Sequence, residues 1–272
     1  MSLDVAVSGI SVITGLGDGI EAILDGLNKE RGKNPEIDAS LYTDIISDID
    51  KGPYELHRIQ KLTAIAFMKA LSMSKTCISE YDSEKIAVIL GNSYGVEEFK
   101  TEFFRKYKTS PPLLVNPSLF PYTTANSIAA WLAIQFKVKG FNLTFTNGCI
   151  SGSSAIISGC DCIISGKADI AIIVGISFLC DDLKEDFYRS GFKQEVSGAI
   201  ILEKREKVVS SGRKPLVLIK DFKHGFLFEE DIQSLNGLTL PGVLKGDGTE
   251  ITVTHLGNSL GEVKFEYHEK QG

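Results

Sequence analysis

A cysteine at a tight turn is the strongest candidate for chemistry in this chain. Cys149 lies in Thr146–Gly152 (TNGCISG), between a strand-like and a helix-like segment. A helix N-terminus offers unpaired backbone N–H groups and a positive dipole end, which favour a thiolate. The same groups, including the N–H of Cys149, can stabilise an oxyanion when a thioester is attacked. The small neighbours Gly148, Ser151 and Gly152 leave room for an acyl substrate, so the turn predicts a nucleophile that forms an acyl-enzyme.

The other cysteines lack this setting. Cys160 and Cys162 fall inside a helix-like apolar segment, where side chains two residues apart diverge, so no shared metal site is expected. Cys77 and Cys180 have no distinguishing neighbours. A single cysteine in an α/β core is usually a packing residue, so the role of Cys149 depends on the surrounding segments.

The elements that must position this turn alternate between strands and helices. Continuous apolar runs predict buried strands, and apolar spacings of three and four predict helices. The expected strands are 5–13, 86–90, 142–146, 170–174, 198–202 and 216–219, and the expected helices are 20–27, 58–74, 127–136, 153–165 and 203–211. This order predicts an α/β fold with a mostly parallel sheet and helices on both faces.

Three segments depart from the alternation. Residues 36–52 are rich in aspartate and predict a surface insertion, and four prolines predict an irregular chain over 108–121. After Phe222 the pattern weakens: 237–248 is loop-like, while 251–254 and 263–267 are compatible with strands.

Composition narrows the functional class. The 272 residues are 43% hydrophobic with a formal net charge of −6 and no basic run, so nucleic acid is not an expected partner. No segment approaches the roughly 18 apolar residues of a membrane span, and the N-terminus lacks the pattern of a signal peptide. Five cysteines without regular spacing predict free thiols in a reducing compartment, the cytoplasm. Gly15–Gly19 (GLGDG) lacks the third glycine of a dinucleotide motif, and no cofactor is expected.

The segments around Cys149 together resemble those of β-ketoacyl synthases. Asn116–Pro121 (NPSLFP), then Asn126 and a helix of small residues, then Lys139-Gly140 before a strand and the cysteine turn follow the order of that family. The similarity continues through Ile164–Asp169 (ISGKAD) to a strand that ends at Gly175.

Two flanking segments extend the resemblance to residues 4–220. Glu195–Lys204 is similar to the family's glycine-rich strand, with two glycines replaced, and Ile13–Gly17 is similar to its first strand and turn. The resemblance implies a thiolase-like fold, with 1–220 as a ketosynthase N-terminal-like domain and 221–272 as a shortened C-terminal extension. It also implies acyl carrier protein thioesters as substrates, and a homodimer or a heterodimer with a ketosynthase through strand 142–146.

The C-terminal part departs from the family. Ketosynthases use two further histidines for condensation, and only His224 and His255 are candidates here. Residues 257–261 are weakly similar to the second histidine motif, but Asn258 stands where its histidine is expected. His57 and His268 are expected at the surface. Two hypotheses remain: a β-ketoacyl synthase-like acyltransferase of fatty acid or polyketide biosynthesis acylated on Cys149, and a non-catalytic partner similar to a chain-length factor.

Overall fold

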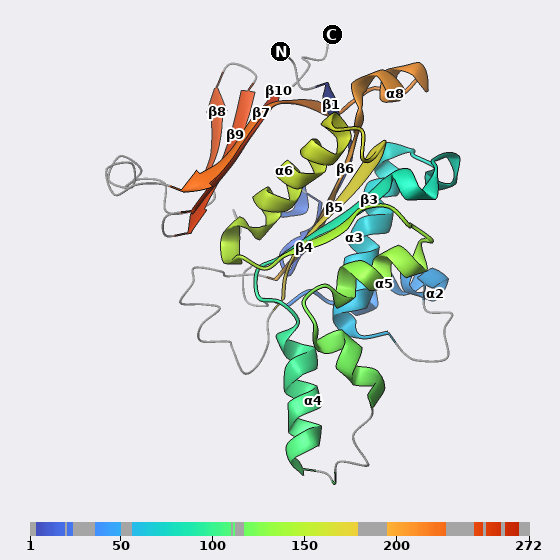
Figure 1. Cartoon of the computed structure of the whole chain (residues 1–272), viewed down its shortest axis with the longest axis vertical. Coiled ribbons are helices and arrows are strands. Elements are labelled where there is room, and N and C mark those ends of the chain that lie inside the picture. The colour runs from blue at the N-terminus through green and yellow to red at the C-terminus, as the bar shows by residue number, and fades with distance from the viewer. Residues whose placement is uncertain are drawn as a thin grey trace.

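The computed structural model describes residues 4–19, 21–23, 36–49, 56–109, 111, 117–178, 195–226, 242–246, 249–256 and 259–266. These residues form one sheet with helices on both faces (Figure 1). The strands are β1 (Val5–Thr14), β2 (Gly17–Asp18), β3 (Ile86–Asn92), β4 (Asn142–Phe145), β5 (Ile170–Ser177), β6 (Val196–Lys204), β7 (Val217–Phe226), β8 (Gly242–Gly246), β9 (Thr249–Leu256) and β10 (Ser259–Glu266). The main helices are α2 (Thr43–Ile49), α3 (Arg58–Ser74), α4 (Glu97–Thr109), α5 (Ser127–Gln135), α6 (Ser151–Ile164) and α8 (Arg205–Ser210).

The sheet has two parts. Its strand order is β4-β3-β5-β6-β1-β7-β10-β9-β8, with β2 paired to β1. In the first part, β3 is parallel to β4 and β5, and β1 has the same direction because both β1 and β5 are antiparallel to β6. The predicted mostly parallel α/β sheet is therefore confirmed for the strands before β7.

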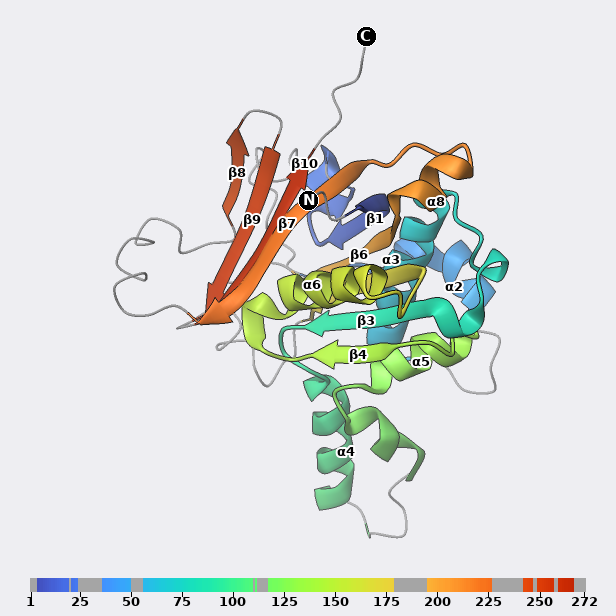
Figure 2. The ribbon, with the colours of Figure 1, turned by 45° about the horizontal axis from the view of Figure 1, so that its top comes forward.

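The second part of the sheet is antiparallel throughout, from the β1–β7 pair to the β8–β9 pair. The strands suggested at 251–254 and 263–267 are confirmed as β9 and β10, which both begin earlier, while residue 267 lies outside the described residues. The loop expected over 237–248 is wrong for Gly242–Gly246, because these residues pair with β9 as β8. Figure 2 shows this part curving away from the helix-covered part.

Alternating side chains of the central strands supply two separate cores. On one face Val88, Leu90 and Ile172 pack with residues of α3 and α5. On the other face Ile89 and Ile173 pack with residues of α6. Because successive strand residues point to opposite faces, a strand buried on both faces needs a continuous apolar run, and every residue of β3 is buried.

A buried carboxylate joins the first strands to the chain that follows them. Glu203 is fully buried near the end of β6 and accepts hydrogen bonds from Arg213 at 2.8 and 2.9 Å, and from Ser8 and Tyr81. Burial alone would raise the pKa of Glu203, but the hydrogen bonds and charge of Arg213 outweigh burial and lower that pKa. The paired charge therefore fixes Arg213 against strands β1 and β6.

Three expectations need correction. Residues 36–49 include α2, whose Ile49 is buried, so this segment is more than a surface insertion. The helix α4 reaches Thr109, and Pro117–Thr123 forms the 3-10 helix η5 around Pro121, so the segment 108–121 is only partly irregular. His57 is half-buried because it caps the N-terminus of α3 and its ring packs on Phe99.

Candidate functional site

The turn that precedes α6 is formed by a short 3-10 helix, η6 (Gly148–Ile150). Thr146 and Asn147 separate it from β4, and it leads without interruption into α6. Gly148 has φ +70°, a left-handed conformation that a residue with a Cβ adopts only at a cost. The backbone of Cys149 therefore lies at the junction of an edge strand with the first turn of a 14-residue helix.

The hydroxyl of Ser151 holds this turn together. Its Oγ accepts a hydrogen bond from the backbone N–H of Asn147 at 3.0 Å. It also lies 2.7 Å from the carbonyl oxygen of Gly148 and 3.2 Å from that of Asn92. Ser151 is 1% exposed, so its hydroxyl positions the turn instead of projecting into open space.

Close backbone contact between β3 and α6 fixes the position of the first turn of α6. A Cβ built on Gly91 would lie 2.5 Å from the carbonyl oxygen of Ser151 and 2.8 Å from the Cα of Gly152. Sequence reasoning missed Gly91. The signal available was a glycine at the end of the apolar run of β3, where a close approach of another backbone is common.

The N-terminus of α6 has no side-chain cap. Its N-cap residue is Ile150, which makes no side-chain capping hydrogen bond, and Asn147 makes none at the start of η6. The backbone N–H of Ser151 donates to the carbonyl oxygen of Gly148, and the first turn of the helix keeps the positive dipole end that favours an anion. This arrangement can stabilise a thiolate or an oxyanion at position 149.

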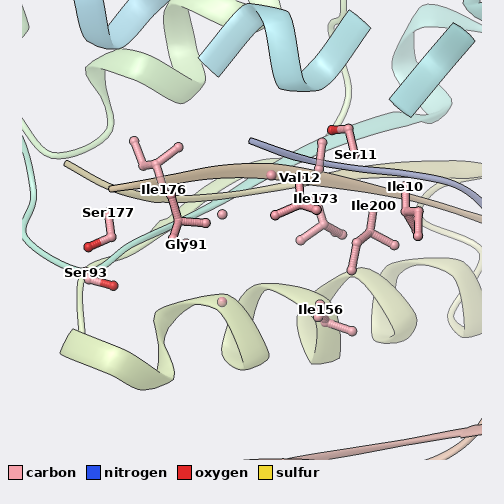
Figure 3. Close-up of a pocket in the computed structure, with 15 residues that line it drawn as sticks. Ile10, Ser11, Val12, Gly91, Ser93, Ile156, Ile173, Ile176, Ser177 and Ile200 are labelled. Atoms are coloured by element: carbon pink, nitrogen blue, oxygen red, sulfur yellow. The ribbon is translucent and has the colours of Figure 1, made fainter. Parts of the chain in front are cut away.

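A row of glycines opens a space between α6 and the sheet. Gly91, Gly175 and Gly198 are paired side by side on β3, β5 and β6. They line a cavity of about 440 Å³, together with Gly152 and Ile156 of α6 (Figure 3). Gly152, predicted to line a substrate site, thus lies on the wall of an apolar cavity beside α6.

The two candidate histidines lie on strands of the antiparallel part. Register pairs His224 of β7 with Gly261 of β10, whereas His255 of β9 pairs with Leu260. Residues paired across an antiparallel ladder share a face and neighbours along a strand alternate, so positions 224 and 255 belong to opposite faces. Both β9 and β10 contact η6, but the two positions do not converge on one face.

Some sequence expectations lie outside the described residues. They include the side chains of Cys149, His224 and His255, and the whole of Cys180, His268, Asn258 and helix residues 20 and 24–27. Of the described cysteines, Cys160 and Cys162 are buried in α6 and Cys77 is exposed. No group of residues able to hold a metal occurs in the described ranges, and none of their helices is long and apolar enough to cross a membrane.

Solved ketosynthase structures have the same overall fold as this chain. A solved chain from a complex of a type II polyketide acyl carrier protein with its ketosynthase bound to the hexaketide matches with a TM-score of 0.78 at 13% identity, over 97% of this chain and 99% of that chain. The ishigamide ketosynthase/chain length factor matches with a TM-score of 0.65 at 20% identity, over 85% of this chain and 69% of that chain. These likenesses establish the fold.

The sequence establishes the family. The family model for the N-terminal domain of β-ketoacyl synthases matches residues 49–190, just over half of the chain, so the chain belongs to this family. Probable polyketide synthase 29 of Dictyostelium discoideum is 22% identical over 169 residues, which cover 55% of this chain. The match spans only 5% of that much longer relative.

Proposed function

We propose that this chain is a ketosynthase-like domain of fatty acid or polyketide biosynthesis that accepts an acyl group from acyl carrier protein on Cys149. One observation carries the proposal: the cysteine lies at a left-handed glycine turn directly before the uncapped N-terminus of α6. A thiolate at this position would attack the thioester, and the backbone N–H groups would stabilise the oxyanion that forms.

Substrate binding would use the small residues of the turn. Gly148 would keep the left-handed backbone conformation of the turn before position 149, and Ser151 would fix the turn through its hydrogen bonds to neighbouring backbone. Gly152 would leave free space beside the acyl group, since a Cβ at this position meets nothing within 4 Å among the described atoms.

Condensation is a separate step with further requirements. Decarboxylation of a malonyl thioester leaves an enolate, and in this family two histidines stabilise that charge. The positions of His224 and His255 fall on opposite faces of the antiparallel strands, which disfavours their acting together. We therefore propose that the chain alone is acylated but extends the acyl group only slowly, and that efficient extension requires a partner subunit.

A non-catalytic role similar to that of a chain-length factor is the second candidate. The observation that favours it is the fold likeness to the ishigamide ketosynthase/chain length factor, combined with the opposed register positions of the two histidines. The cysteine at position 149 favours the first candidate, because a subunit without transfer chemistry does not need a nucleophile there.

Mass spectrometry after incubation with acyl-carrier-protein thioesters tests the proposal. We expect a mass increase of one acyl group on Cys149, complete loss of that adduct in Cys149→Ala, and an unchanged adduct in the matched variant Cys77→Ala. Malonyl-dependent extension by the chain alone should be slower than for a complete ketosynthase by a factor of about 10² to 10⁴ for each missing catalytic group.

Each part of the proposal has its own contradicting result. Rapid extension by the isolated chain would show that it holds a complete condensing site. Absence of the acyl adduct, both alone and with a ketosynthase partner, would favour the chain-length-factor role.

A further inference from the structure

The cavity beside α6 changes in character along its length. Three rows of paired residues form its wall on the sheet: Ile173 with Ile200 and Ile10, then Gly175 with Gly198 and Val12, then Ser177 with Val196. A strand advances by about 3.3 Å per residue, so Ile173 and Ser177, which are four residues apart, are separated by about 13 Å. The wall is thus apolar at one end, open in the middle and polar at the other end.

The polar end contains a buried hydroxyl that makes no hydrogen bond to the described residues. Ser177 is 4% exposed, and within the described part of the chain its Oγ makes no hydrogen bond. Other buried serines differ in this respect: Ser197 donates to the carbonyl oxygen of Leu62 at 3.0 Å, and Ser153 to that of Ile150 at 3.0 Å. A buried hydroxyl without a partner lowers stability, so its presence in a cavity wall points to a ligand that completes the hydrogen bond.

The polar end lies beside the cysteine turn. The backbone N–H of Ser93, which also lines the cavity, donates to the carbonyl oxygen of Ile176 at 3.2 Å. Asn92, the preceding residue, is held by the hydroxyl of Ser151 in the turn. Figure 3 shows Ser93 and Ser177 together at one end of the cavity, with Ile10 and Ile200 at the other end.

We propose that this cavity binds a linear apolar chain that has a carbonyl oxygen at one end, with Ser177 Oγ donating a hydrogen bond to that oxygen. The tail of the ligand would lie over the glycine row and end against Ile10, Ile156 and Ile200. The volume of about 440 Å³ is within the usual range for small-molecule sites, which are mostly apolar with a few placed polar groups.

The identity of the ligand as an acyl chain rests on the proposed function, but the binding site does not. A chain attached to Cys149 would enter from the polar end, where Gly152 of the first turn of α6 lines the wall. Ser177 would then be a specificity-determining residue that favours chains with an oxygen near the point of attachment.

Two probes of equal shape isolate the hydrogen bond. In 2-octanone a carbonyl oxygen occupies the position of the methylene group in 2-methyl-1-octene, so only the ketone accepts a hydrogen bond. Binding is measured by headspace gas chromatography on the full chain with Cys149→Ala, which removes covalent chemistry. The experiment is therefore independent of acylation, and its failure is distinguishable from failure of the proposed function.

Variants of the cavity wall then test the hydrogen bond of Ser177 and the space over the glycine row separately. Ser177→Ala should weaken binding of the ketone by about threefold to tenfold and leave binding of the alkene unchanged. Ser11→Ala is the matched control, because Ser11 also lines the cavity but its hydroxyl donates to the carbonyl oxygen of Ala66 at 2.6 Å. Gly175→Val should abolish binding of both probes, since a Cβ there meets nothing within 4 Å among the described atoms and its side chain would fill the cavity.

Circular dichroism and thermal unfolding establish that each variant is folded. If Gly175→Val is unfolded, Gly152→Leu fills the same cavity from the helix side. Equal ketone binding by the Ser177→Ala variant, binding of both probes in the folded cavity-filling variants, or no binding of either probe at millimolar concentration would overturn the proposal.

Discussion

At the scale of single residues, the five thiols differ in their surroundings. Burial raises the pKa of both Cys160 and Cys162, which lie within α6, so these thiols are poor nucleophiles. Cys77 is exposed and lies 3.0 Å from the hydroxyl of Ser79. Of the described thiols, Cys77 is therefore the one that can compete with Cys149 for a reagent.

We predict that Cys149 is the most reactive of the five thiols, because its backbone position joins a tight turn to a helix N-terminus. Iodoacetamide at limiting concentration, followed by peptide mapping, should find the first label on this residue. The variant Cys77→Ser controls for labelling of an exposed thiol. Preferential labelling of Cys77 or Cys180, with Cys149 unmodified, would contradict the nucleophile assignment.

At the scale of elements, α6 contains two glycines in opposite surroundings. A Cβ on Gly152 would meet nothing within 4 Å among the described atoms. A Cβ on Gly159 would lie 2.5 Å from Cδ1 of Ile173 and 3.0 Å from Cδ1 of Leu202. The first glycine leaves space in the cavity, whereas the second lets the middle of the helix pack against the sheet.

These surroundings predict opposite effects of the same substitution on the free energy of unfolding. Gly152→Ala should stabilise the protein by about 0.5–1 kcal/mol, because alanine has the higher helix propensity and fits without a clash. Gly159→Ala should destabilise it by about 1–3 kcal/mol through overpacking. Urea denaturation of both variants measures the two values. A stabilising effect of Gly159→Ala would show that Ile173 moves aside without cost.

At the scale of the whole molecule, the described part of the sheet ends in an edge strand. Among the described strands, β4 is the last in the order and pairs only with β3. Edge strands present free backbone N–H and C=O groups that can pair with another chain. Leu143 and Phe145 of this strand are only half-buried within one chain.

We predict that β4 forms an interface with a second ketosynthase-like subunit, either another copy or a partner. Multi-angle light scattering at micromolar concentration should then give a mass of two subunits, and Leu143→Lys should reduce it to one because the charge would be buried. Phe104→Lys, at an exposed residue of α4, is the control. A monomer at this concentration, both alone and with an adjacent ketosynthase, would contradict the prediction.

Local sequence patterns were sufficient to predict the elements in which buried residues follow a regular spacing. The helix expected over 58–74 has the same bounds in the structure. His57 caps its N-terminus, and Lys75, which has a left-handed conformation, ends it where the apolar spacing ends. The run Ile86–Leu90 predicted β3 because a strand covered on both faces is apolar at every position. The helix α4 escaped prediction, since only Phe99 among its residues is buried and most of its residues are polar or charged.

The family, the alternation of strands and helices, and the turn that contains Cys149 could be predicted from the chain, because apolar periodicity and turn residues are local signals. Which distant residues meet became known only from the folded structure. The glycine row, the position of the Ser177 hydroxyl in the cavity wall and the opposite faces of positions 224 and 255 all depend on strand order and register. A shift of one residue in pairing would move each of them to the other face of the sheet, and no local pattern records that choice.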